Sequence, residues 1–208
     1  IATAFGYTNI STIRAATSPV RDWLGINPRT RRPHLPDATK SRAFEDRGIG
    51  VYQIDGLLID TDLFRRTRLR GQARGADGIE DLKTALRLVT GRPFDQLRPY
   101  GWSWLIDTGI EHHMVCAIVD VAHLLTTHFL QHDQIDQARQ ATETALLAAP
   151  YDTTAKLDLA EIVKAEGHPE QAKRIVDEEI CNLPDDDGLP GDIGERTARV
   201  LGRMSHRE

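Results

Sequence analysis

The sequence predicts a mostly α-helical protein, in which a short basic N-terminal part precedes an array of helix pairs. Three observations lead to this prediction. Apolar residues recur at helical spacing through almost the whole chain after residue 57. Two stretches in the second half match each other when the chain is shifted by thirty-four residues. Residues 1–54, in contrast, contain four prolines and hold eight lysine and arginine residues against four acidic ones.

The composition is that of an ordinary soluble domain and excludes several classes of protein. Of the 208 residues, 40% are hydrophobic and 27% are charged. Two cysteines are too few for a disulfide-stapled secreted domain or for a four-cysteine zinc site. The longest apolar stretch, 114–130, contains Asp120, His123 and His128, so the sequence predicts no transmembrane span and no direct membrane contact. The first residue is Ile1 rather than Met, which indicates a piece of a longer protein.

The first predicted element is a helix through residues 13–24. Thr8 or Asn9 is suited to cap its N-terminus, and Gly25 is suited to end it. Pro19 lies inside this run and predicts either a kink or a late start.

A basic loop and a strand are expected next. Segment 27–33 is rich in proline and arginine and predicts a turn between short extended pieces. Segment 48–54 contains β-branched and aromatic residues and ends at Asp55 and Gly56, which predicts a strand that closes a β-hairpin. The expected order is therefore helix, basic loop and strand.

The rest of the chain predicts a series of amphipathic helices. Each has apolar residues at i, i+3 and i+4, and glycine, proline or aspartate separates it from the next. Asp133 and Asp152 are good caps for the helices that follow them. The predicted helices cover 61–73, 78–89, 103–131, 134–148, 153–166, 168–182 and 191–204.

Identical residues align when the chain is compared with itself at a shift of thirty-four residues. This shift superimposes Leu125 on Leu159, Gln137 and Ala138 on Gln171 and Ala172, and Pro150 on Pro184. Thirty-four residues is the length of the tetratricopeptide repeat, a helix–turn–helix unit. A small residue near the start of each second helix lets it approach the first closely, and stacked units bury the apolar faces. The sequence thus predicts a right-handed, tetratricopeptide-like array of helix hairpins. Its expected packing residues are Leu125, Ala138, Leu159 and Ala172.

A histidine-rich stretch is the candidate for metal chemistry. On a helix, His112, Cys116 and Asp120 fall on one stripe, and His128 and His132 form an i, i+4 pair. The His-Glu-x-x-His order of zinc proteases is absent, and Cys116 lies among apolar residues, as a buried structural cysteine does. Phosphate-loop, serine-hydrolase and EF-hand patterns are absent too. We therefore expect no catalytic residue, no metal and no cofactor; a metal-dependent enzyme is the least favoured alternative.

The basic N-terminal part contains residues suited to DNA. Polar side chains in the first turns of its helix are placed as in a recognition helix, which presents such side chains to base edges. Arginines in the following loop are suited to phosphates. The alternative is a solvated loop that binds nothing. The predicted DNA contacts are Asn9, Ser11, Thr12, Arg14, Arg29, Arg31, Arg32 and Arg42.

Several of these segments together resemble a known family. A helix ending in Trp23-Leu24-Gly25, a basic loop and then 47–52 resemble the back half of an OmpR-type winged helix, with recognition helix and wing. Residues 60–64, the segment 85–94, and then Trp102 and Trp104 resemble the bacterial transcriptional activator domain of the Streptomyces antibiotic regulatory proteins. The resemblance divides the chain into a partial winged-helix domain, 1–56, and a tetratricopeptide-like activator domain, 57–208.

The resemblance implies a non-enzymatic transcription-regulatory module. DNA would bind to the winged helix, and a protein partner or a second copy to the helical domain. The N-terminal sheet and two helices of a complete winged helix are absent, and 32–38 lengthens the wing region. The chain is most similar to an actinobacterial branch in which this module ends membrane-anchored proteins with LysM segments, which implies a cytoplasmic location. The alternative is a protein-interaction scaffold with a vestigial winged helix.

Overall fold

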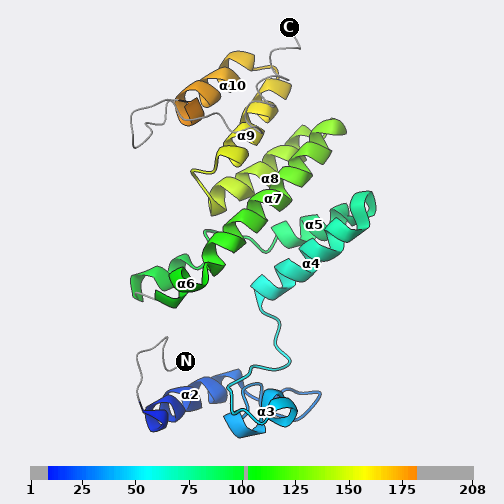
Figure 1. The fold of residues 1–208 in the computed structure, drawn as a ribbon. Coiled ribbons are helices and arrows are strands. Elements are labelled where there is room, and N and C mark those ends of the chain that lie inside the picture. Colours follow the sequence, from blue (N-terminus) through cyan, green and yellow to red (C-terminus); the bar gives the residue numbers. More distant parts are fainter. Residues whose placement is uncertain (1–8, 101–102, 182–208) are drawn as a thin grey trace. The chain divides into compact units, whose positions relative to one another are not determined.

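The computed structural model describes residues 9–100 and 103–181. The chain divides into two compact units, Ile1–Ile59 with Trp102–Trp104, and Asp60–Gly101 with Leu105–Glu208. The described residues are mostly helical and contain no strand, so the prediction of a mostly α-helical protein is confirmed (Figure 1). The predicted helix 191–204 lies outside the described residues.

The first helix of the N-terminal unit, α2, spans Ile10–Leu24. Asn9 caps it, because its side-chain oxygen accepts a hydrogen bond from the Ser11 backbone N–H at 2.9 Å. Gly25 ends it with a φ of 69°, which a glycine adopts without strain. The helix continues through Pro19. The predicted cap and stop are both confirmed.

The predicted strand at 48–54 is wrong. Downstream of an isolated bridge between Ile26 and Pro33, the chain forms a short 3₁₀ helix, η1 (Ala38–Lys40), and helix α3 (Arg42–Arg47). Segment 48–54 pairs with no other strand in the described part of the chain. Strand propensity reflects packing on a half-buried pleated surface, whereas Ile49 is 61% exposed here.

The second unit contains the remaining helices, except for the first two residues of the helix that begins at Ser103. The predicted helix 103–131 is divided in two at Gly109, whose φ is 61°. The other predicted helices within the described residues lie close to their predicted positions. They are α4 (Asp60–Arg74), α5 (Ile79–Leu86), α8 (Ile135–Ala148), α9 (Thr153–Ala165) and α10 (Pro169–Val176), which continues into the π-helical turn η4 (Asp177–Cys181). The divided helix forms α6 (Ser103–Thr108) and α7 (Ile110–Gln131), and two 3₁₀ helices that the sequence did not predict, η2 (Gly75–Gly78) and η3 (Asp95–Tyr100), lie between predicted helices.

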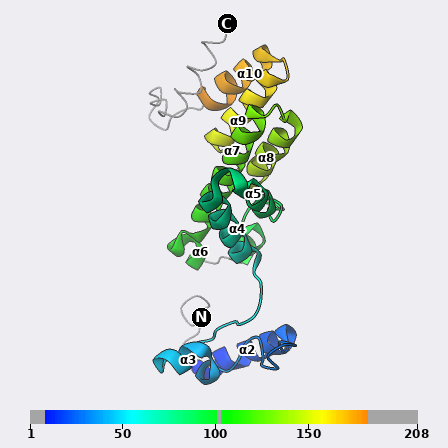
Figure 2. The ribbon, with the colours of Figure 1, turned by 90° about the vertical axis from the view of Figure 1, so that its right-hand side faces the viewer.

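These helices pack as successive pairs (Figures 1 and 2). Helix α4 packs on α5, α7 on α8, and α9 on α10, while α5, α8 and α9 all contact α7. One apolar core extends from Phe64 in α4 to Ile162 in α9, and a smaller cluster joins α9 to α10. Helix α7 is long and apolar enough to cross a membrane, but half of its apolar window is buried, as in the core helix of a soluble protein.

The α7–α8 and α9–α10 turns use the same backbone hydrogen bonds. The Gln134 N–H donates to the Phe129 carbonyl at 2.8 Å, and thirty-four residues later the His168 N–H donates to the Val163 carbonyl at 3.1 Å. Such a bond across the end of a helix satisfies a carbonyl that has no partner within the helix. The internal sequence match therefore corresponds to a repeated turn.

The residue before each of these donors has a left-handed backbone. Asp133 has a φ of 58° and Gly167 has a φ of 88°. Glycine adopts this conformation freely, and aspartate tolerates it better than most residues do. The two different residue types thus occupy equivalent positions. The predicted cap at Asp133 is wrong, because Gln134 is the N-cap residue of α8 and Asp133 belongs to the turn before it.

The four expected packing residues lie along the helix pairs. Ala138 and Ala172 are both 0% exposed, near the starts of α8 and α10. Leu125 is 1% exposed in the main core. Leu159 is only partly buried and packs against the smaller cluster.

Candidate functional sites

The predicted DNA contacts on α2 lie at its exposed N-terminal end. Asn9, Ser11, Thr12 and Arg14 are all exposed. Asn9 and Ser11 also bind each other, since the Asn9 side-chain oxygen accepts from both the backbone N–H and the hydroxyl of Ser11 at 2.9 Å. Capping therefore occupies these two side chains, whereas the Arg14 guanidinium extends into solvent.

Three of the predicted loop arginines surround a tight turn. The Asn27 side-chain oxygen accepts from the backbone N–H groups of Arg29 and Thr30, at 2.9 and 3.2 Å, and this folds the loop back on itself. Arg29, Arg31 and Arg32 are all exposed on this turn. The turn thus presents three guanidinium groups over a short length of chain.

The loop arginines differ from the other arginines of this unit in their partners. Within the described ranges 9–100 and 103–181, no carboxylate lies within ion-pair distance of Arg14, Arg29, Arg31 or Arg32. Arg42 lies 4.0 Å from Asp46 on the same helix. Arg21 is fully engaged, because it donates to the Leu35 carbonyl and pairs with Asp37, both at 2.8 Å. Unpaired exposed guanidinium groups are suited to phosphate oxygens.

The histidine-rich stripe of α7 faces solvent. Cys116 is exposed, so the prediction of a buried cysteine is wrong: the apolar residues beside it in sequence occupy other faces of the helix. Its sulfur lies 3.6 Å from His112 Nε2, and Asp120 pairs with Arg68 of α4 at 3.4 Å. Among the residues that the structure describes, no three histidine, cysteine or acidic side chains are grouped to hold a metal ion.

The predicted His128–His132 pair lies at the end of the same helix. The two rings are 4.3 Å apart, and His132 Nδ1 lies 2.7 Å from the His128 carbonyl oxygen. Burial, followed by the charge of His132, lowers the pKa of His128.

A histidine–carboxylate pair that the sequence does not predict joins His123 and Asp158. His123 Nδ1 lies 2.7 and 3.0 Å from the two carboxylate oxygens of Asp158, which is 4% exposed. The pair joins α7 to α9 across thirty-five residues. No local motif indicates it, because the two residues meet only when the helix pairs stack.

Segment 88–94 borders a hollow of about 400 Å³. Phe64, Met114 and Ile118 contribute apolar surface to it. Arg92 lies at its border and pairs with Glu111 at 3.5 Å. The full lining is Asp60, Thr61, Phe64, Leu88, Val89, Thr90, Gly91, Arg92, Pro93, Phe94, Asp95, Gln96, Met114 and Ile118.

Val89 lines the hollow and also a groove of about 330 Å³. Apolar side chains of α5, α7 and α8 line it, together with charged and amide side chains of α5 and α8. The apolar residues are Leu86, Val89, Leu125, Phe129 and Ala141. The polar residues are Lys83, Arg87, Gln137, Gln140 and Thr144.

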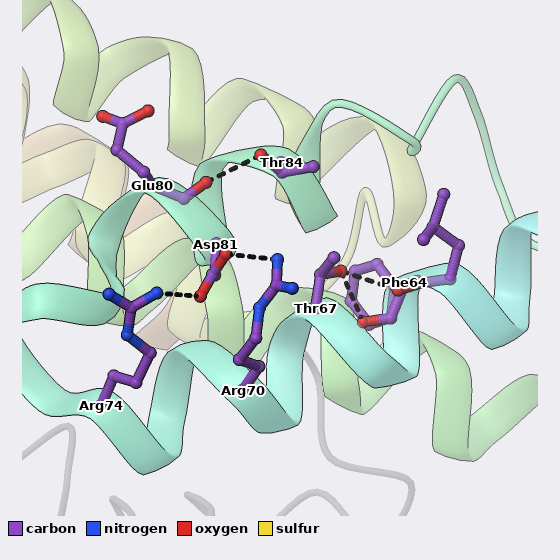
Figure 3. Close-up of polar contacts among 8 residues, drawn as sticks. Phe64, Thr67, Arg70, Arg74, Glu80, Asp81 and Thr84 are labelled. Carbon is purple, nitrogen blue, oxygen red and sulfur yellow. Dashed lines mark hydrogen bonds and ion pairs between the residues drawn. The ribbon is translucent and has the colours of Figure 1, made fainter.

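An ion-pair fork fixes α5 against α4 (Figure 3). Of the two cations of this groove, Lys83 lies in α5 and Arg87 directly follows it. Asp81 accepts from Arg70 at 2.6 Å and from Arg74 at 3.3 Å. The hydrogen bond from Arg70 is the main cause that lowers the pKa of Asp81. The two helices also touch closely, since a Cβ at Gly71 would lie 2.8 Å from the Leu82 side chain.

The two pairs with the chemistry of a catalytic dyad, His112 with Cys116 and His123 with Asp158, line neither the hollow nor the groove. No family model, curated protein or solved structure matches the chain.

Proposed function

We propose that the chain is a non-enzymatic transcription-regulatory module. Its N-terminal unit binds DNA, and its helical unit binds a protein partner or a second copy of the chain. The observation that carries the proposal is the set of exposed arginines Arg14, Arg29, Arg31 and Arg32, which have no acidic partner among the described residues. Residues 1–54 carry a net charge of +4, which favours a polyanionic ligand.

In this proposal α2 is the recognition helix of a partial winged helix. The exposed N-terminal end of α2 and the turn around Asn27, which follows the C-terminal end of this helix, supply the proposed contacts. The absence of a strand at 48–54 leaves no paired wing there, so the proposed contacts are limited to α2, the loop and Arg42. The site lies in the cytoplasm, at the end of a membrane-anchored parent protein.

The helical unit is proposed to be a tetratricopeptide-like array. Support comes from the repeated turn and from the two fully buried alanines at equivalent positions. The order Leu125, Phe129, Ala138 and Pro150 also follows the leucine, aromatic, alanine and proline order of that repeat. Arrays of this kind commonly present extended binding surfaces.

The DNA-binding proposal is tested by the salt dependence of binding. We expect the chain to bind a labelled duplex weakly and without sequence preference. Each phosphate contact contributes about −0.9 to the slope of log affinity against log salt. Replacement of Arg29, Arg31 and Arg32 by alanine should therefore make the slope shallower by about 2 to 3 and weaken binding at low salt. Fluorescence anisotropy at several salt concentrations measures both.

The matched control removes three cations from the helical unit. Arg65, Arg66 and Lys173 are exposed there, so the triple alanine variant changes the net charge by the same amount. We expect the control to retain the slope of the unmodified chain. Equal slopes for all three proteins, or no binding by any of them, would contradict the proposal.

A second candidate function is a protein-interaction scaffold whose N-terminal unit is vestigial. It is favoured by the absence of a strand at 48–54, because a winged helix without a wing loses part of its DNA-binding surface. In this case the helical unit should still bind its partner, while the arginine variants should have no effect on any ligand.

A further inference from the structure

We infer that the groove between α5 and α8 binds an extended acidic segment of a partner protein, with an apolar side chain of that segment seated on the groove floor. The inference rests on the proposed role of the helical unit in protein binding. It adds where the partner binds on this unit and which chemical groups the partner presents.

The arrangement of three helices leaves room for such a segment. Helices α5 and α8 both pack on α7, and Leu125 and Phe129 of α7 line the groove between them. Leu86 from α5 and Ala141 from α8 complete the apolar floor. A volume of about 330 Å³ accommodates a few side chains rather than a folded domain.

The α5 side of the groove is cationic. Lys83 pairs with Glu80 at 2.7 Å, and the pKa of Glu80 is lowered mainly by this hydrogen bond and further by the charges of Lys83 and Arg87. Arg87 is exposed, and in the part of the chain that the structure describes no carboxylate lies within ion-pair distance of it. One guanidinium thus remains to bind an incoming carboxylate.

The α8 side offers neutral hydrogen-bond donors. Gln137 and Gln140 are exposed amides, and Thr144 lies one turn further along the helix. The acid Glu143 does not line the groove; it pairs with Arg139 at 3.8 Å. The groove lining, as far as the structure describes it, contains two cations and no acid. This charge balance favours an anionic ligand.

An acidic peptide fits these features better than a nucleic acid does. Residues 55–208 have 27 acidic side chains against 18 basic ones, and this net negative charge repels a long polyanion more strongly than a short acidic segment. The apolar floor, moreover, matches an aliphatic side chain, which a nucleic acid lacks. A short segment that alternates acidic and aliphatic residues satisfies both parts of the groove.

The test uses the full chain and a fluorescein-labelled octapeptide of glutamate, aspartate and leucine, with a lysine-for-acid peptide of the same length as its counterpart. We expect the acidic peptide alone to bind, as measured by anisotropy. Arg87→Glu should weaken its binding about tenfold or more, because a charge-assisted contact becomes a repulsion. The control Arg65→Glu, on the exposed face of α4, should bind like the unmodified chain.

A second variant tests the opposite wall. The Gln137→Glu, Gln140→Glu double variant changes exposed positions only, so it should fold normally by circular dichroism and still lose acidic-peptide affinity. Equal binding of both peptides, no binding of the acidic peptide, or unchanged affinity in Arg87→Glu would each overturn the inference. Binding of duplex DNA that Arg87→Glu abolishes would overturn it in favour of a nucleic-acid groove.

The two proposals fail separately. The Arg29, Arg31, Arg32 alanine variant should keep its acidic-peptide affinity, and Arg87→Glu should keep its salt-dependent DNA binding. Absence of DNA binding by the unmodified chain, with peptide binding intact, therefore refutes only the role of the N-terminal unit. Absence of peptide binding by the unmodified chain, with DNA binding intact, refutes only the groove.

Discussion

The two units of the molecule are stabilised in different ways. Both apolar clusters lie in the helical unit. The larger cluster contains buried residues of α4, α5, α7, α8 and α9, and the smaller one contains residues of α9 and α10. The described part of the N-terminal unit has only four buried residues, Thr17, His34, Leu35 and Ser41, and just one of them is apolar. Burial of apolar side chains therefore stabilises the helical unit, whereas individual hydrogen bonds and ion pairs stabilise the N-terminal unit.

Hydrogen bonds to backbone carbonyls join separate segments of the N-terminal unit. The His34 N–H donates to the Gly25 carbonyl at 3.0 Å, and the Asp55 N–H donates to the His34 carbonyl at 2.8 Å. Arg21 donates to the Leu35 carbonyl. Each such bond contributes only about 0.5–1.5 kcal/mol, so the unit depends on all of them together.

Truncation of a buried leucine should give the largest difference between the units. Leu125→Ala opens a cavity in the main core and should lower the free energy of unfolding by about 2–5 kcal/mol. Leu35 is also buried, at 5% exposure, but it belongs to neither apolar cluster, so Leu35→Ala should cost less. Urea unfolding followed by far-UV circular dichroism measures both. Equal losses would show that the N-terminal unit has a core of its own.

Enlargement of a buried alanine should have the next largest effect. Ala138→Leu overpacks the crossing of α7 and α8 and should destabilise the chain by about 1–3 kcal/mol. Ala165 is an exposed alanine at the end of α9, and Ala165→Leu should stay within about 0.5 kcal/mol of the unmodified chain. If thermal melts show no loss for Ala138→Leu, the close packing at this crossing is refuted.

The two helix caps permit a smaller comparison. Asp152 accepts from the Ala155 N–H at 3.0 Å and Asn9 accepts from the Ser11 N–H at 2.9 Å, so either alanine variant should cost about 1 kcal/mol. The loss in Asp152→Ala should lower the stability of the whole helical unit. In Asn9→Ala it should increase amide exchange in α2 alone. Hydrogen exchange with mass spectrometry distinguishes the two, and faster exchange throughout the chain in Asn9→Ala would contradict the separation of the units.

The pH dependence of the Asp81 fork is the smallest expected effect. The Arg70 hydrogen bond lowers the pKa of Asp81 in the folded state, so its stabilisation is present above the unfolded pKa of about 3.9 and is lost as the pH falls through the folded value. Asp81→Asn should therefore lower the urea midpoint at pH 7, and the difference should shrink as the pH falls from about 5 toward 2. A difference that persists at low pH would assign the loss to packing.

The sequence predicted what depends on periodicity and missed what depends on tertiary contacts. The cap at Asn9, the stop at Gly25 and the predicted helices that became α4, α5, α8, α9 and α10 follow from local pattern and are confirmed. The prediction of a strand at 48–54 is wrong because the composition of a segment does not show whether a partner strand is present. The break at Gly109 also escaped, since the apolar pattern continues across it.

The candidate sites show the same division. The loop arginines are visible as a local excess of charge, and the structure places them in solvent. The groove combines α5 with two helices that begin more than twenty residues later in the chain, so only the fold brings its residues together. The His123–Asp158 pair is hidden for the same reason.

The repeated turn also sets the rotational phase of each second helix. An α-helix rotates by about 100° per residue, so the bond from Gln134 to Phe129 determines which residue of α8 faces α7. One residue inserted between the turn and Ala138 would bring Gln137 into the place of the alanine. The helical run that begins at Pro169 continues through η4 to Cys181, and Ala138 and Ala172 are equally buried near the starts of α8 and α10. The common turn therefore determines which residue of each second helix is buried.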